Sequence, residues 1–557
     1  MQLLPAAVND PHAVVPDRFR VACIWAFFAR NAWHPSTSTA YDTAMSLMQR
    51  SLVFAPTLKI QHDRLVAMRQ QCERMPLDYA SLQLQKGRLE HAIETLERGR
   101  ALLWSEMRGL RTSIDRLLGV DSPIAVRFAA INRDLQELAT STLPHKNIEA
   151  DDKGPEGGGS IDPFGRLVIK QRKLLRERDM LISQIENLPG FDDMALAAPS
   201  FDTLRSAASN GPIIIINHCQ WRSDILIISH DCPPSLIPTP EDFYKRASKL
   251  KDQLLDTRKK CGLDSEMYEL TLASVLADLY ELVGRSVIDK LRELNVPEQS
   301  RVWWCPTSAF CSLPLHAMGP VPSDNNDGQY FSDLYISSYT PTLSALIESR
   351  RPDPQSSGRP SLVLVAQPDE SLPGVWGEMK IIQALNTQVT GLILEDATPT
   401  AVLAGLRDHR LAHFSCHGTL ETGKPFDASF ELDGDQRLTL LDIVRSQLPA
   451  AEFAFLSACH TAELTDKSVP DEGLHLAAAI QYCGYRSVVG TMWAMADTDG
   501  RDLAKNFYRS MFSSKGNLNG TPYHERSATA LRDSVQKLRR KRGVTLERWV
   551  NFVHYGA

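Results

Sequence analysis

Residues Leu411–Leu420 read LAHFSCHGTL, and residues Phe453–Ala462 read FAFLSACHTA. Each stretch begins with a continuous apolar run, which is typical of a strand buried on both faces of a parallel sheet. Each run leads into a chemically versatile side chain, His417 in the first stretch and Cys459 in the second. Catalytic groups gather at the carboxyl ends of the strands in such sheets. We therefore expect the two side chains to meet if the two strands are neighbours.

The sequence on either side of these stretches alternates between strand and helix patterns from about residue 212 onward. Further strands are predicted at 212–217, 224–229, 301–305, 361–366 and 486–490, with helices at 241–256, 265–294, 375–386, 398–408, 472–483 and 500–512. Alternation of this kind favours an α/β fold, in which a mostly parallel sheet is flanked by helices.

Residues 1–145 have apolar side chains at three- and four-residue spacing, which predicts an all-α region. Small side chains such as Ala44 and Ala92 would let two helices approach closely, and the pattern resembles degenerate tetratricopeptide repeats. An unrelated helical bundle is the alternative. Acidic residues, proline and glycines over 146–162 predict a flexible linker, and 163–196 contains an amphipathic connecting helix.

Composition excludes several classes of protein. The 557 residues contain 61 Lys and Arg against 67 Asp and Glu, so a net charge of −6 gives no general attraction to nucleic acid or to an anionic membrane. The sequence lacks both a stretch of ~20 apolar residues and a convincing signal peptide. Ten scattered cysteines without metal-ligand spacing favour free thiols in the cytoplasm. We expect no metal and no cofactor, since no glycine-rich phosphate loop follows a predicted strand.

The pairing of an imidazole with a thiol is the chemistry of nucleophilic cysteine catalysis. A thiol at its reference pKa of ~8.5 is largely protonated at neutral pH, and a neighbouring imidazole or a helix N-terminus beyond the thiol would favour its anion. The backbone N–H groups of Gly418 and Cys459 are candidate donors to the oxyanion of the intermediate. His417 would protonate the leaving amine and then activate water against the thioester.

A structural interpretation of the same residues stays open. A cysteine at a strand end is often a small buried side chain, and a lone histidine is often a hydrogen-bonded turn residue. The other candidates are weaker. Cys416 lies inside the apolar run, Cys483 ends a predicted helix, and His460 would point to the opposite face from its neighbour Cys459.

The motifs also occur in a familiar order. The chain contains HFSCHG, then LSACHTA, then EGLHLAAAIQYCGYRSVVGTMWAMAD. This series of motifs resembles the CHAT domain, a caspase- and separase-like cysteine peptidase module found behind tetratricopeptide repeats. Four further segments resemble the fungal type of this domain, namely VWWCPTSAFCSLPLHAMG, YISSYTPTLSAL, SLPGVWGEMKIIQAL and WVNFVHYG. The resemblance covers 197–557, with a catalytic half at about 360–557, and implies a caspase-like fold.

The resemblance implies roles for four residues. His417 matches the general base, Cys459 the nucleophile, and Gly418 the glycine after the base. Asp497 resembles the acid that receives a basic substrate side chain in separase-like relatives, although it could instead cap the helix predicted near 500, as could Asp499.

The leading hypothesis is a cysteine endopeptidase that acts on a protein or peptide substrate in a signalling or defence context. The N-terminal repeats would bind a regulatory protein and gate the site through the polar loop after Cys459, TAELTDKSVPDEG. No nucleic-acid or membrane partner is expected. The alternative function is a catalytically silent caspase-like scaffold for protein–protein interactions.

Overall fold

The structure, a computed structural model, shows two compact units, residues 1–75 with 101–198 and residues 76–100 with 199–557. It describes residues 3–10, 12–53, 55–71, 74–111, 115–141, 163–188, 199–262, 264–320, 329–351, 360–385, 387–421, 423–448, 450–464, 468–513 and 522–557. The linker expected over 146–162 lies outside these residues.

The first unit is all-α in the residues described. Its helices are α1 (Leu3–Val8), α2 (Val15–Asn31), α3 (Thr37–Val53), α4 (Leu58–Gln71), α7 (Leu102–Gly109), α8 (Asp115–Leu118), α9 (Ser122–Ala139) and α10 (Pro163–Glu186). Helices α9 and α10 pack through an apolar cluster that includes Phe128, Leu135 and Leu181. The Arg178 Nε atom donates a 2.8 Å hydrogen bond to Asn132 within this interface, so a buried guanidinium is satisfied there.

The second unit is built on an 11-stranded sheet in the order β3-β2-β1-β4-β5-β14-β13-β12-β8-β6-β7. The strands are β1 (Ile213–Asn217), β2 (Asp224–Ile228), β3 (Ser235–Pro238), β4 (Arg301–Cys305), β5 (Ile336–Tyr339), β6 (Ser361–Ala366), β7 (Gln388–Ile393), β8 (Leu411–Ser415), β12 (Phe453–Ser457), β13 (Ser487–Thr491) and β14 (Phe552–Gly556). Only the β3–β2, β2–β1 and β13–β14 pairs are antiparallel. A small second sheet contains β9 (Gly418–Thr419), β10 (Ser429–Glu431) and β11 (Arg437–Thr439).

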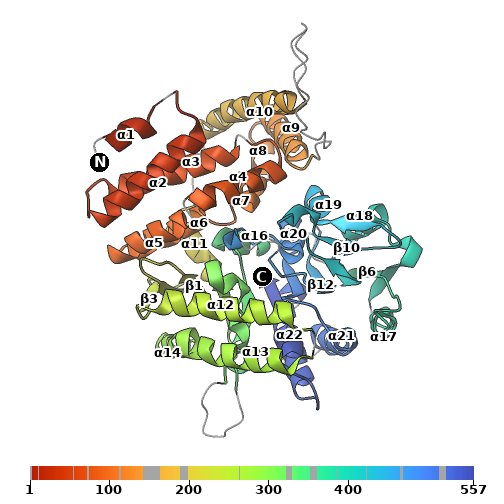
Figure 1. The fold of residues 1–557 in the computed structure, drawn as a ribbon. Coiled ribbons are helices and arrows are strands. Elements are labelled where there is room, and N and C mark those ends of the chain that lie inside the picture. Colours follow the sequence, from red (N-terminus) through yellow and green to blue (C-terminus); the bar gives the residue numbers. More distant parts are fainter. Residues whose placement is uncertain are drawn as a thin grey trace, which may run out of the picture. The chain divides into compact units, whose positions relative to one another are not determined.

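Helices cover both faces of the large sheet, as the α/β prediction required (Figure 1). Helices α17 (Val375–Gln383), α21 (Asp497–Met511) and α22 (Tyr523–Arg539) lie on one face, and α18 (Pro399–Asp408) and α20 (Leu476–Tyr482) lie on the other. The remaining helices of this unit are α5 (Met75–Gln85), α6 (Leu89–Arg98), α11 (Phe201–Arg205), α12 (Phe243–Lys260), α13 (Glu266–Leu279), α14 (Arg285–Glu293), α15 (Phe331–Leu334), α16 (Leu343–Ser349), α19 (Leu440–Arg445) and α23 (Leu546–Val550). The predicted fold class, a mostly parallel sheet flanked by helices and preceded by an all-α region, is confirmed.

Helices α5 and α6 belong to the core of the second unit, although they lie in the helical part of the sequence. Ile93 and Leu96 of α6 are almost fully buried in a cluster that also contains Leu204, Ile215 and Leu346. The chain passes into the first unit immediately after Arg100. Helices α5 and α6 are therefore packed against the large sheet and covalently continuous with the other unit.

Two predicted helices differ from the observed ones. The helix expected over 265–294 contains a π-helical segment, Tyr280–Gly284, between α13 and α14. The helix expected from 472 begins at Leu476, because the imidazole of His475 accepts the backbone N–H of Ala478 at 3.1 Å and caps it. None of the helices in the described ranges has the length and apolarity to cross a membrane.

Candidate functional site

The two decisive segments lie side by side. Strands β8 and β12 are parallel neighbours, with Ser415 opposite Ser457 at their carboxyl ends. His417 and Cys459 each follow two residues later, at the same edge of the sheet. The backbones touch there, since a Cβ atom built on Gly418 would lie only 2.3 Å from the carbonyl oxygen of Cys459. A glycine is required at this position because of that close approach.

The imidazole of His417 is held by two side chains that the sequence analysis missed. Its Nε2 atom lies 2.8 Å from the hydroxyl oxygen of Ser371 and 3.3 Å from Oδ2 of Asp369. The Ser371 hydroxyl donates to Oδ1 of Asp369 at 2.6 Å, so it must accept from His417. Nε2 therefore carries the hydrogen, and Nδ1 has the lone pair that can accept a thiol proton.

Asp369 is ionised at neutral pH. Its pKa is lowered, first by the hydroxyl of Ser371 and further by the backbone N–H groups of Ser371 and Leu372 and by the charge of His417. Asp369 and Ser371 follow β6, which is the neighbour of β8 in the sheet. The ends of the three adjacent strands β6, β8 and β12 therefore contribute to one cluster. The signal in the sequence was the polar stretch after the apolar run Ser361–Ala366, at the edge where a parallel sheet gathers functional groups.

The thiol of Cys459 is partly exposed and is protonated at neutral pH. Burial raises the pKa of this thiol. The backbone N–H of Met495, which lies 3.4 Å from the sulfur, and the charge of Arg258 lower the pKa and offset only part of this rise. Residues 459–462 form turns, and the next α-helix in the described residues, α20, begins at Leu476. The resting thiol thus needs a base to deprotonate it.

Asp497 is the first residue of α21, and its Oδ2 atom accepts the backbone N–H of Gly374 in the loop before α17. Its pKa is raised, first by burial and then by the charge of Glu378, against the lowering effect of the Gly374 N–H. Asp499 differs, since its carboxylate forms an ion pair with Arg548. Asp497 therefore remains the acid that lies close to the cluster.

The weaker candidates have other partners. The pKa of Cys416 is raised by burial, and Cys483 lies 2.7 Å from the carbonyl oxygen of Ile443. His460 adopts a left-handed conformation, with φ at 61°, and its Nδ1 lies 2.6 Å from Glu463. The burial of Cys416 and the contacts of Cys483 and His460 leave these three side chains weaker candidates than His417 and Cys459.

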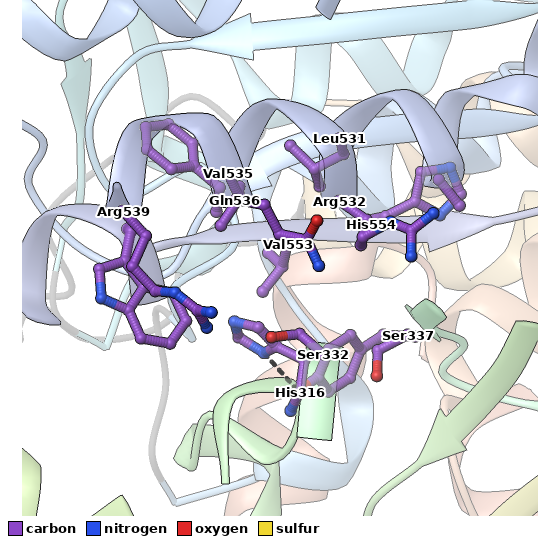
Figure 2. Close-up of a pocket in the computed structure, with 14 residues that line it drawn as sticks. His316, Ser332, Ser337, Leu531, Arg532, Val535, Gln536, Arg539, Val553 and His554 are labelled. Carbon is purple, nitrogen blue, oxygen red and sulfur yellow. Dashed lines mark hydrogen bonds between the residues drawn. The ribbon is translucent and has the colours of Figure 1, made fainter. Parts of the chain in front are cut away.

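A separate pocket lies between α22 and strands β5 and β14 (Figure 2). His316, Tyr339, Arg532 and His554 are among its lining residues, and its volume of about 40 Å³ has room for a few water molecules. The imidazole of His316 is bonded on both sides, to the hydroxyl of Tyr339 at 2.9 Å and to the carbonyl of Val550 at 2.9 Å. None of the lining residues lies in the segments directly after β6, β8 and β12 that form the strand-end cluster, so the pocket is distinct from that cluster.

Comparison with known proteins supports one family. The model of the CHAT domain family matches residues 273–557, just over half of the chain, whereas no curated protein sequence matches. Saccharomyces cerevisiae separase, in a complex with securin, aligns with a TM-score of 0.42 and 11% identity over 100% of this chain and 48% of the separase chain. This chain thus spans about half the length of that separase. The Porphyromonas gingivalis RgpB complex of pro- and mature domains aligns with a TM-score of 0.30 and 9% identity over 57% of this chain and 77% of RgpB. The chain therefore belongs to the CHAT domain family.

Proposed function

We propose that the protein is a cysteine endopeptidase in which His417 and Cys459 form the catalytic dyad. One observation carries the proposal: Ser371 and Asp369 hold Nε2 of His417 and leave Nδ1 as the basic nitrogen, beside a strand end that bears a protonated thiol. A nucleophile, a base and a third group that orients the base are the parts that covalent catalysis requires.

The reaction follows from these parts. Nδ1 of His417 takes the thiol proton as the sulfur of Cys459 attacks the carbonyl carbon of the substrate peptide. The N–H groups of Gly418 and Cys459 are the proposed donors to the oxyanion, and the proton on the imidazolium passes to the leaving amine. Water, deprotonated by the same imidazole, then hydrolyses the thioester and frees the sulfur.

We assign Asp497 to substrate binding. The carboxylate is partly exposed, lies close enough to His417 for their charges to interact, and is oriented by the N–H of Gly374. An Arg or Lys side chain of the substrate would pair with it. Burial raises the pKa of Asp497, and a cationic group beside the carboxylate would favour its charged form.

We propose that the N-terminal helices gate the site, on the basis of contacts made by α6 and by Arg100, which follows it. Glu97 accepts the backbone N–H groups of Leu343 and Ser344 at the start of α16, each at 2.9 Å. Arg100 is buried, donates to the sulfur of Cys305 at 3.1 Å, and interacts electrostatically with Asp471.

Asp471 links this contact to the site, because it lies in the loop that follows Cys459. Its carboxylate is 4% exposed and accepts the backbone N–H of Ser308 at 2.7 Å. A regulatory protein bound to the helical repeats could therefore act on the loop through Arg100, where the chain crosses between the two units. A signalling or defence context fits such control.

The test uses a thiol-reactive peptidyl electrophile that bears Arg. Labelling of Cys459 in the wild type and its loss in His417→Ala would support the dyad, and weaker labelling in Asp497→Asn would support the substrate assignment. Cys232 is the exposed control thiol and its Cys232→Ser variant should leave labelling of Cys459 unchanged. Equal labelling of the wild type and His417→Ala would favour the alternative, a silent scaffold for protein–protein interactions.

A further inference from the structure

A single carboxylate oxygen lies beneath both strand ends. Oε2 of Glu378 accepts the hydroxyl of Ser415 at 2.6 Å and the hydroxyl of Ser457 at 3.1 Å. These serines are paired in register on β8 and β12, two residues before His417 and Cys459 respectively. We propose that Glu378 is a positioning residue, which fixes the separation of the two catalytic side chains by bonding both strands through one atom; this rests on the proposed dyad.

The carboxylate of Glu378 is buried, so its hydrogen bonds are made to protein groups. Glu378 is 3% exposed, while Ser415 is fully buried and Ser457 is 6% exposed. A buried carboxylate is tolerated only where hydrogen bonds replace its lost hydration, so both serine hydroxyls are held at hydrogen-bonding distance from it. Movement of either strand end away from its neighbour would break one of these bonds.

The other carboxylate oxygen is also occupied. Oε1 of Glu378 lies 3.1 Å from Nε2 of His413, and Nδ1 of the same imidazole lies 2.8 Å from the hydroxyl of Tyr508. His413 and Tyr508 are both fully buried. The chain of donors therefore runs from Tyr508 on α21 through β8 to Glu378 on α17, and it fixes the direction of the carboxylate.

The space around Oε2 leaves little freedom. A Cβ atom built on Gly500, in the first turn of α21, would lie 3.1 Å from Oε2 of Glu378 and 2.9 Å from Oγ of Ser457. Backbone, hydroxyls and carboxylate are thus packed tightly, so a shift of the carboxylate transmits to both strands. Glu378 cannot reach substrate from this buried place and acts only through the residues it holds.

The effect on the site follows from the short path. One residue separates Ser415 from His417, and one separates Ser457 from Cys459, a span of about 7 Å along a strand. Loss of either serine hydroxyl frees one strand end, and proton transfer from sulfur to imidazole is sensitive to displacements of 1 Å. Loss of both should cost little more than loss of one, since both act through the same oxygen.

The experiment measures the rate at which iodoacetamide alkylates Cys459, resolved by mass spectrometry of the peptide and followed from pH 6 to 9. Ser415→Ala and Ser457→Ala are each expected to lower the rate at neutral pH about fivefold to tenfold, with the double variant close to the single ones. Their pH profiles should shift towards that of His417→Ala. Glu378→Gln keeps an oxygen that both hydroxyls can reach and should lower the rate less than either serine variant does.

The matched control is Ser487→Ala on β13, because Ser487 is also a fully buried serine whose hydroxyl donates to a backbone carbonyl, that of His524, at 3.0 Å. It should lower the Tm as much as the other serine variants but leave the alkylation profile unchanged. A rate that follows Tm in all three variants, or wild-type profiles in Ser415→Ala and Ser457→Ala, would overturn the positioning role. Alkylation needs no peptide substrate, so a wild type that cleaves nothing would defeat the proposed peptidase and still leave this result decisive.

Discussion

The α-carbon of Gly418 faces the carbonyl oxygen of Cys459 so closely that a Cβ atom between them would stand 2.3 Å from that oxygen. The contact joins the residue after the proposed base to the proposed nucleophile, across the ends of β8 and β12. Distances that short do not occur between real Cβ and backbone atoms, so any side chain at 418 must displace one strand end.

Gly418→Ala is therefore expected to reduce the labelling rate of Cys459 by a peptidyl electrophile at least tenfold. Gly262→Ala is the control, because nothing lies within 4 Å of a Cβ built at Gly262. Mass spectrometry of the labelled peptide gives both rates. Equal rates in the two variants would show that the close approach has no bearing on the thiol.

Asp369→Asn should lower kcat/KM about tenfold to a hundredfold while KM changes little, because the imidazolium formed during acylation loses its anionic neighbour. Ser371→Ala should have a smaller effect and Ser371→Thr should restore activity, since threonine retains the hydroxyl that bridges Asp369 and His417. Inactivation kinetics with a peptidyl electrophile measure the same loss. A KM effect alone would assign both residues to substrate binding instead.

The stability of the second unit should fall in mild acid because of His475. Burial lowers the pKa of this imidazole to about 3, whereas an unfolded chain takes up the proton below about 6.5. The neutral form stabilises the fold above pH 6.5, and this contribution is lost as the pH falls from 6.5 towards 3, at about 1.4 kcal/mol per pH unit. Chemical unfolding at pH 7, 6 and 5 measures the slope.

His475→Asn should flatten this pH dependence by about one proton, because asparagine also caps a helix but does not titrate. His230→Asn removes an exposed histidine from the same unit and should leave the slope unchanged. The same slope in His475→Asn and the wild type would assign the acid sensitivity to other buried groups, such as His316, whose pKa burial lowers to about 4.

Arg100→Ala should loosen the loop that follows Cys459, because Asp471 loses its buried cationic neighbour. Hydrogen exchange of residues 468–474 is expected to rise about tenfold, with a change in the labelling rate of Cys459. Arg88→Ala, at an exposed position before α6, is the control. Unchanged exchange in this loop would remove Arg100 from the proposed gating route.

Leu96→Ala should destabilise the second unit by about 2–5 kcal/mol, since this fully packed side chain of α6 lies in the cluster with Leu204 and Ile215. Glu90→Ala, on the exposed side of the same helix, should cost less than about 0.5 kcal/mol. Denaturation followed by the fluorescence of the buried Trp303 in that cluster reports the change. A small effect of Leu96→Ala would mean that α6 does not belong to this core.

Continuous apolar runs made β1, β2, β8 and β12 predictable, because strands buried on both faces leave no polar alternation to confuse the pattern. Strand β14, Phe552–Gly556, contains His554 and Tyr555 and was not recognised as a strand. Its place in the sheet depends on β13 and β5, which lie on either side of it. Pairing with partners distant in sequence outweighed a weak local preference.

The sequence by itself determined that His417 and Cys459, the residues proposed to form the dyad, each follow a buried strand, because apolar runs and turn residues are local properties of the chain. Only the tertiary structure decided that β6, β8 and β12 are adjacent, so that Asp369 and Ser371 reach His417 and Glu378 bonds both strands. Strand order and side-chain contacts depend on crossovers that bring together distant residues, such as Glu378 and Ser457, which are 79 positions apart, and no local pattern records them. The raised pKa of Cys459 is likewise a property of burial, which arises only when the whole sheet and its helices assemble.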